Sequence, residues 1–303
     1  MANGEPHDIN DTGRFVFYRY EPSIAAAVIF IVLFAITTLL HIYQIIRRRT
    51  WYFIPLAVGG IFEAVSYAAR VASAKDQWAL TPYIVQSLLS LVAPALFAAS
   101  IYIILGRIIL LVDGERFSLV RKTWLTKLFV AGDVLSFLIQ GAGGGLQGSS
   151  NGKESTTKLG ENLIVVGLFV QLAFFGAFVI VSGIFHFRLV RSRHSHSVKI
   201  DALPWKRHLV TLYVTGGLIL VRSVFRVVEY LQGNAGYLLR HEAYLYVFDA
   251  LLMFVVMVAF NVVHPSQVTE AWQERQSPQE RVAKNWQNRS SKLNVSAVTR
   301  AST

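Results

Sequence analysis

The sequence predicts an all-α, polytopic membrane protein with seven transmembrane helices. Hydrophobic residues make up 53% of the 303-residue chain and charged residues only 16%, which is far from the balance of a soluble globular protein. The apolar residues also fall into seven runs, each long enough to cross the roughly 30 Å of hydrocarbon in a bilayer. The predicted spans cover residues 23–46, 51–71, 82–112, 123–141, 159–187, 209–231 and 243–263.

Polar stretches separate these spans and flank them. The first span follows about twenty polar residues and is too long for the apolar core of a signal peptide, so we expect it to insert as an anchor. The fourth span is the least apolar, because Asp133 and Gln140 interrupt it. Residues 141–160 are rich in glycine and serine and predict a flexible external loop. The chain therefore divides into an N-terminal segment (1–22), a seven-helix domain (23–264) and a polar tail (265–303) that is disordered or only partly helical.

The distribution of Lys and Arg predicts the orientation of the helices. The connections after the first, third and fifth spans hold most of the basic residues, including Arg47 to Arg49 and Arg188 to Arg193. By the positive-inside rule these connections are cytoplasmic, which puts the N-terminus outside and the C-terminus inside. The net charge of +11 is then a mark of topology and not of nucleic-acid binding. Asn10, in Asn10-Asp11-Thr12, is a predicted glycosylation site on the outer side.

Charged residues inside the spans are the main functional signal. The sixth span carries three of them on one helix face, namely Arg222, Arg226 and Glu229. The second span repeats this spacing with the charge order reversed, in Glu63, Tyr67 and Arg70. Such residues persist in a membrane when they face a partner or a watery cavity. We therefore expect Glu63 to pair with Arg222 or Arg226. At a similar depth, we expect Arg70 to pair with Glu229.

Further polar residues lie in the middle or the outer half of the other spans at a rise of 1.5 Å per residue. They are Gln86, Asp133, Gln140, Gln171, Glu242 and Asp249. Together with the two charged triads they predict a polar interior that binds a ligand, and its acids suit a cationic amine head group attached to an apolar tail. The alternative is that these residues only join helices, as polar side chains in membrane proteins often do.

The chain lacks residues that several other classes of protein need. The chain has no cysteine, and no Lys between Lys206 and Lys284 is available for a retinal Schiff base. Gly152-Lys153 is followed by Glu154, where a phosphate-binding loop requires Ser or Thr. His41, His186, His208 and His264 lie near the cytoplasmic ends of their spans, where interface anchoring is favoured over metal or haem ligation because no acid accompanies them. We therefore expect no metal ion, no other cofactor and no enzymatic activity.

A series of aromatic, small and charged residues runs in order through all seven spans. It comprises Tyr20-Glu21-Pro22-Ser23; Gly60, Glu63, Tyr67 and Arg70; Tyr83, Gln86, Pro94, Ala98, Ala99, Tyr102, Gly106 and Arg107; Asp133, Ser136, Gln140 and Gly143 to Gly145; Gly167 and Gln171; Arg222, Phe225, Arg226, Glu229 and Gly233; and Glu242, Tyr246, Asp249, His264 and Pro265. In these residues the chain resembles the fungal lipid-translocating exporter family, seven-span proteins first associated with aminocholesterol resistance. Ser66 departs from the pattern, because the family usually has glycine before the tyrosine.

The resemblance implies that the protein moves amphipathic lipids or lipid-like metabolites, or confers resistance to toxic ones, at a fungal plasma membrane. Its partners would be membrane lipids and an amphipathic, sphingoid-base-like substrate. A seven-helix receptor or regulator that senses lipid is the alternative, and transport of porphyrin or haem ranks third. The substrate, energy source and oligomeric state stay open at this point.

Overall fold

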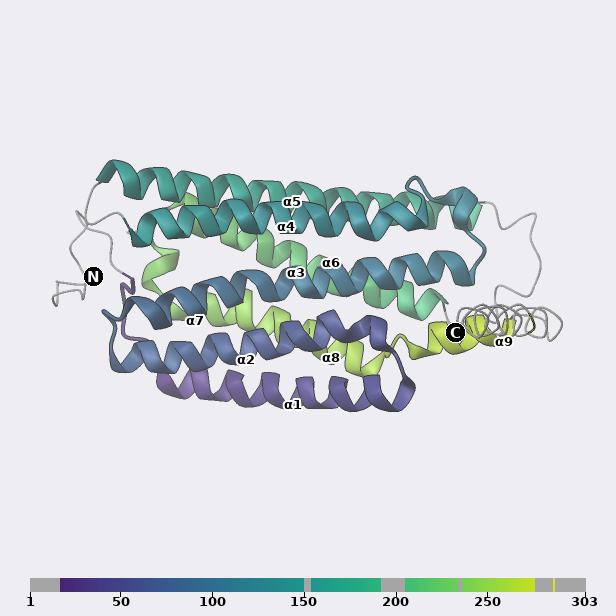
Figure 1. The fold of residues 1–303 in the computed structure, drawn as a ribbon, viewed down its shortest axis with the longest axis horizontal. Coiled ribbons are helices and arrows are strands. Elements are labelled where there is room, and N and C mark those ends of the chain that lie inside the picture. The colour runs from purple at the N-terminus through teal and green to yellow at the C-terminus, as the bar shows by residue number, and fades with distance from the viewer. Residues whose placement is uncertain (1–16, 150–153, 192–204, 234–235, 276–285, 287–303) are drawn as a thin grey trace, which may run out of the picture.

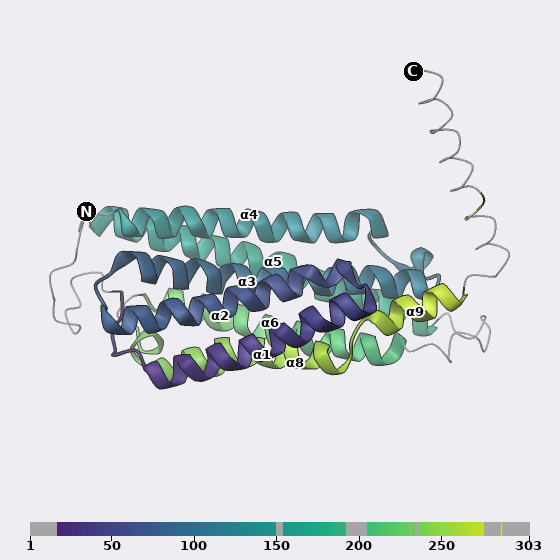
Figure 2. The same cartoon turned by 60° about the horizontal axis from the view of Figure 1, so that its bottom comes forward.

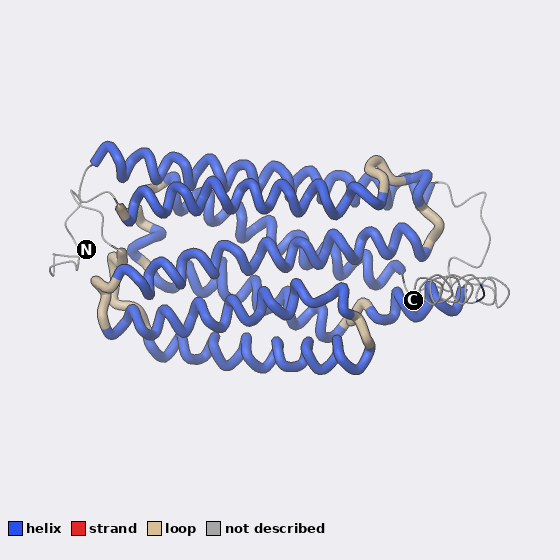
Figure 3. The backbone as a smooth tube through the Cα atoms, viewed as in Figure 1, coloured by secondary structure: helices blue, strands red, loops and turns tan. Residues whose placement is uncertain are grey.

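Seven helices of membrane-spanning length run side by side in the computed structural model (Figure 1). The structure describes residues 17–149, 154–191, 205–233, 236–275 and 286. The first six spans are α1 (Ile24–Arg48), α2 (Ile54–Lys75), α3 (Leu80–Leu111), α4 (Lys122–Gly148), α5 (Glu154–Arg191) and α6 (Trp205–Leu231). The seventh consists of α7 (Glu242–Leu245), the π-helix η6 (Tyr246–Leu251) and α8 (Leu252–Val262), and it leads into α9 (Ser266–Arg275). The regular structure in the described residues is all helical (Figure 3), which confirms the predicted fold class.

Short 3-10 helices lie in three of the connections: η1 (Trp51–Phe53), η2 (Glu115–Phe117) and η5 (Leu238–Arg240). Both ends of α1 have capping features. The Ser23 hydroxyl accepts the Ala26 backbone N–H at 3.3 Å, which caps one of the free donors at the start of α1. Arg49, with φ of 52°, adopts the left-handed conformation that ends the helix.

The bundle buries polar residues and exposes apolar ones, as a protein surrounded by lipid does. Ile29 and Leu39 on α1 are 58% and 65% exposed, whereas Arg70 and Arg222 are at most 1% exposed. The helix α3 lies in the middle, in contact with α2, α4 and α6. In the turned view, α1 and α8 lie together on one side and α4 with α5 on the other (Figure 2). The polar interior is thus enclosed by the packing of α2, α3, α6 and the seventh span.

The two ends of the bundle differ in charge. The first and third connections, which carry Arg47 to Arg49 and Arg116, lie at the same end as α9 (Figure 1). We call this the C-terminal end; residues 17–23 and the start of α7 lie at the opposite, N-terminal end. This arrangement agrees with the basic pattern in the sequence, while the direction across the membrane stays a prediction. Asn10 lies outside the described residues.

The predicted loop over residues 141–160 is wrong for most of its length. Residues 141–148 continue α4, and α5 begins at Glu154. A Cβ on Gly143 would lie 2.6 Å from the Gly160 carbonyl oxygen, and a Cβ on Gly160 would lie equally close to the Gly143 oxygen. Glycine disfavours a helix by about 1 kcal/mol, but here it permits the backbones of α4 and α5 to touch. This close packing outweighs the local preference of the sequence.

Candidate functional site

Two buried arginines of α6 form the centre of a polar network. Arg222 Nε donates to a carboxylate oxygen of Asp249 in η6, and its Nη2 donates to the Ser90 carbonyl oxygen in α3 at 2.6 Å. Arg226 Nη1 donates to Glu229 Oε2 at 2.7 Å, and its Nη2 lies 3.9 Å from Asp249 Oδ2. The Ser90 hydroxyl donates to Asp249 Oδ2 at 3.1 Å and accepts from Arg226 at 3.3 Å. Two guanidinium groups are thus balanced by two carboxylates, as charges buried away from water require. We call these five residues the core network.

A third buried arginine connects several segments of the chain at the N-terminal end of the bundle. Arg70 of α2 donates from Nη2 to Glu242 Oε1 at 2.8 Å and to the Tyr20 hydroxyl at 2.6 Å. Its Nε donates to the Tyr246 hydroxyl at 3.2 Å. Glu242 also accepts the Ser23 backbone N–H, at 2.9 and 3.0 Å from its two oxygens. This Arg70 cluster therefore fixes α2, the seventh span and the chain before α1 to one another.

The predicted ion pairs are wrong in their partners. Glu63, which we expected to meet an arginine of α6, forms no ion pair within the described residues, and its Oε1 has no hydrogen-bond partner there. Arg70 pairs with Glu242 and not with Glu229. The α6 arginines instead contact Asp249, which lies in η6. Residue spacing gives the depth of a side chain, but it does not give the rotation of one helix relative to the next.

Other predicted site residues lie outside these two groups. Tyr67 stacks among aromatic rings, including that of Tyr246 at 6.0 Å between centroids. The Tyr102 hydroxyl donates to Asp133 Oδ2 at 3.0 Å. Gln140 Nε2 donates to Gln171 Oε1 at 3.3 Å, between α4 and α5. The predicted single polar level is therefore divided among several separate contacts.

The chain just before α1 is part of the site, which the sequence analysis missed when it assigned residues 1–22 to an external segment. Tyr18 is 4% exposed, and its hydroxyl donates to Gln86 Oε1 at 2.6 Å. Phe17 stacks on Tyr83 of α3 at 4.7 Å. Burial raises the pKa of the Tyr18 and Tyr20 hydroxyls above the ordinary value of 10.0, although the nearby Arg70 guanidinium acts in the opposite direction. The aromatic residues directly ahead of the first span were the signal that could have revealed this contact.

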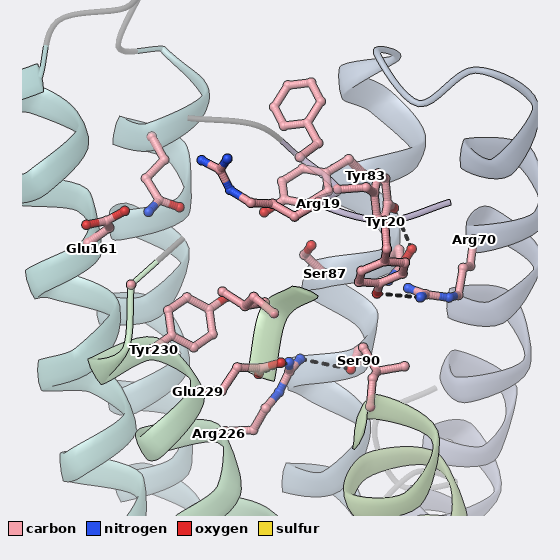
Figure 4. Close-up of a pocket in the computed structure, with 17 residues that line it drawn as sticks. Arg19, Tyr20, Arg70, Tyr83, Ser87, Ser90, Glu161, Arg226, Glu229 and Tyr230 are labelled. Atoms are coloured by element: carbon pink, nitrogen blue, oxygen red, sulfur yellow. Dashed lines mark hydrogen bonds and ion pairs between the residues drawn. The ribbon is translucent and has the colours of Figure 1, made fainter. Parts of the chain in front are cut away.

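Residues 17–20 cover a polar pocket at the N-terminal end of the bundle (Figure 4). Its cavity of about 80 Å³ has room for several water molecules or a small polar group, and not for a whole lipid. Figure 4 shows Glu161 and Arg70 coming from helices on opposite sides, with Tyr230, Glu229, Arg226 and Ser90 along one wall. Among the predicted site residues, Arg70, Gln86, Arg226 and Glu229 line it.

A second, mainly apolar pocket adjoins the first. Its cavity of about 140 Å³ lies between α3 and α4, and five residues line both pockets: Phe17, Tyr83, Ser87, Gln147 and Tyr230. The remaining lining is Leu80, Ile84, Leu88 and Leu91 of α3, Ile164 of α5, and Gln140, Gly141, Gly144, Gly145 and Gly148 of α4. A charged space thus lies directly beside an apolar one. The described His, Asp and Glu residues form no group of three that could hold a metal ion.

The fold and the site together define an integral, multi-pass membrane protein with an amphipathic interior. The model of the RTA1-like protein family matches residues 56–271, and the chain belongs to this family. It is 38% identical to protoporphyrin uptake protein 1 of Saccharomyces cerevisiae, over 83% of this chain and 92% of that protein.

Two other relatives come from the same yeast. The chain is 37% identical to protein RTA1, over 83% of this chain and 85% of that one. It is 26% identical to sphingoid long-chain base transporter RSB1, over 80% of this chain and 72% of that one. These names connect the family with transport across membranes and with fungi. No solved structure matches the chain.

Proposed function

We propose that the protein moves an amphipathic lipid or lipid-like metabolite across its membrane without ATP and without chemical change to the lipid. The observation that carries this proposal is that the charged pocket and the apolar pocket adjoin each other, with Tyr83, Ser87 and Tyr230 lining both. A small polar head group would occupy the charged pocket, and the attached chain would lie in the apolar one. A soluble metabolite would have no use for the second pocket.

The charges in the polar pocket suit a head group that carries an amine and hydroxyl groups. Glu161 and Glu229 supply carboxylates, while the tyrosine hydroxyls of the lining can donate or accept hydrogen bonds. Of the acids that the sequence suggested for an amine, Glu229 lines this pocket, whereas Asp133, Glu242 and Asp249 do not. The similarity to a sphingoid long-chain base transporter supports the same head-group chemistry.

Porphyrin transport is the second candidate, and a specific observation favours it. The relative named protoporphyrin uptake protein 1 matches over 92% of its own length. Three arginines also line the polar pocket, namely Arg19, Arg70 and Arg226. They would suit the carboxylates of a porphyrin.

The test is transbilayer movement of a fluorescent sphingoid base in liposomes that contain the purified protein. We expect the protein to accelerate this movement and Glu161→Gln to slow it, because that change removes one carboxylate of the pocket and spares the core network. Glu115→Gln, at the C-terminal end, is the matched control and should leave the rate unchanged. Faster movement of porphyrin alone would favour the second candidate. Binding of the sphingoid base without movement would favour a lipid-sensing receptor, and a chemically altered lipid would favour an enzyme.

We also propose that the N-terminal end faces outward at the plasma membrane. The gathering of basic residues at the opposite end supports this orientation. Glycosidase should then shift the native protein on a gel, and Asn10→Gln should abolish the shift. An N-terminus accessible only after the cells are permeabilised would contradict the orientation.

A further inference from the structure

A row of glycines on α4 faces a row of apolar side chains on α3 across the apolar pocket. Gly141, Gly144, Gly145 and Gly148 are spaced three, one and three residues apart, so they share one helix face. Opposite them, Leu80, Ile84, Leu88 and Leu91 are spaced four, four and three residues apart on α3. The glycines extend over roughly 10 Å at 1.5 Å per residue. The two rows therefore border the same pocket from opposite sides.

Helix packing does not require glycine at these positions. A Cβ added at Gly141, Gly144 or Gly145 would meet no atom within 4 Å, and one at Gly148 would meet only Leu80 Cδ1, at 3.8 Å. Gly143 on the same helix differs, because its Cβ would collide with α5 at 2.6 Å. Glycine is one of the least favourable residues in a helix interior. Its use here keeps space open instead of bringing two helices together.

The side chain of Gln140, which lines the same pocket, has a buried polar atom with no partner among the described residues. Gln140 is 2% exposed, and its Nε2 donates to Gln171. Its Oε1 accepts no hydrogen bond within the part of the chain that the structure describes. An unsatisfied carbonyl in an apolar environment is unfavourable, and a hydroxyl or amine proton of a bound molecule would satisfy it. This second observation indicates a ligand and not merely loose packing.

We infer that the apolar pocket is a slot for one unbranched hydrocarbon chain, and that the four glycines set its width. The inference deepens the proposed function and rests on it, since the chain belongs to the ligand whose head group occupies the polar pocket. A hydroxyl of that ligand donates to Gln140 Oε1. The glycines are then the residues that determine which chains enter, because a large side chain at the half-buried Gly141 or Gly144 would reach into the slot.

The test uses the full-length protein in lipid nanodiscs and a sphingoid base that carries a photoactivatable diazirine midway along its chain. After irradiation, mass spectrometry identifies the labelled peptides. We expect labelling on residues 80–91 of α3 and 140–148 of α4. Replacing Gly144 in turn by Ala, Val and Leu should reduce this labelling in that order, by about five-fold or more for Gly144→Leu, since overfilling a site disfavours its occupant by about that factor or more.

Gly176→Leu is the matched control. Gly176 lies on α5, does not line either pocket, and has no atom within 4 Å of an added Cβ. It should leave the labelling unchanged. Gly141→Leu is a second slot-filling variant for use if Gly144→Leu fails to give a helical, monodisperse protein.

The outcomes separate the slot from the transport function. Labelling in the wild-type protein at other helices, or undiminished labelling in folded Gly144→Leu and Gly141→Leu, would overturn the inference. Labelling in the slot without transbilayer movement in liposomes would uphold the slot and refute transport. Movement of the lipid together with labelling elsewhere would uphold transport and refute the slot.

Discussion

Replacing Asp249 by asparagine removes the carboxylate on which the core network depends. The side chains of Arg222 and Asp249 are 1% and 2% exposed, so the arginine left behind has no access to water. It would keep its 2.6 Å contact with the Ser90 carbonyl oxygen, and Arg226 would lose a carboxylate that lies 3.9 Å away. Glu229, which pairs with Arg226, would then be the one carboxylate left in the core network.

Two estimates bear on the size of the effect. Neutral polar contacts between membrane helices contribute only about 0.6 kcal/mol on average. An uncompensated charge is different, because breaking one side of a buried pair costs about 3–5 kcal/mol, and an arginine at the centre of a membrane helix costs about 2.5–3.5 kcal/mol. The charge is the deciding feature here. We therefore expect Asp249→Asn to lower the free energy of unfolding by about 3 kcal/mol.

The assay is unfolding in mixed micelles, followed by circular dichroism. Glu63→Gln is the matched control, because Glu63 is also 1% exposed but forms no ion pair in the described structure; it should cost less than about 1 kcal/mol. Adding Arg222→Met to Asp249→Asn should recover much of the loss, since the unpaired charge is then gone. Equal losses for Glu63→Gln and Asp249→Asn would refute the reasoning, because Glu63 would then be a counter-ion of the arginines.

Three further predictions concern the covering segment and the helix contacts. Glu242→Gln should raise amide hydrogen exchange in residues 18–23, because the backbone N–H that begins α1 loses a charged acceptor; unchanged protection would show that Glu242 does not hold the segment. Burial raises the pKa of Tyr20 above 10.0. Residues 17–20 are therefore held most firmly below pH 10.0, and they loosen as the pH rises through the raised pKa. Tyrosinate absorbance of the wild-type protein, compared with that of Tyr20→Phe, should show this loosening. Gly60→Ala should lower the free energy of unfolding by about 1–3 kcal/mol, since its Cβ would collide with Thr38 Oγ1 and with Met257 Cε. Gly106→Ala should raise the free energy of unfolding by about 0.5–1 kcal/mol, because an added Cβ there has no atom within 4 Å. Equal changes in the unfolding curves of the two variants would contradict the close contact at Gly60.

Much of the fold could be predicted because membrane insertion depends on local composition. Each span needs only enough consecutive apolar residues, and the seven predicted runs correspond to the seven helices of the structure. The burial of Arg222, Arg226 and Glu229 also followed from the energetics of charge in lipid. Asp249 did not follow as a partner, because spacing along one helix does not give the rotation of that helix relative to its neighbours.

The candidate site was predicted only in part, and the missing parts are those that involve contact between distant segments. Residues 17–20 read as a polar extension of the chain, but they lie over the pocket because Arg70 and Gln86 offer them buried hydrogen bonds. The glycines after residue 140 resemble a loop in any local window. They are helical because Gly143 and Gly160 let two backbones meet.

The sequence by itself determined the class of the protein, the number of its spans and the residues that must avoid lipid. These properties depend on the free energy of transferring each segment from water to hydrocarbon. That free energy is determined largely by the residues that are adjacent in the chain. Only the tertiary structure decided that Asp249 and not Glu63 balances the α6 arginines, and that the glycines of α4 line a pocket. Those outcomes depend on the rotation and close approach of helices, and such contacts are settled only when all seven pack together.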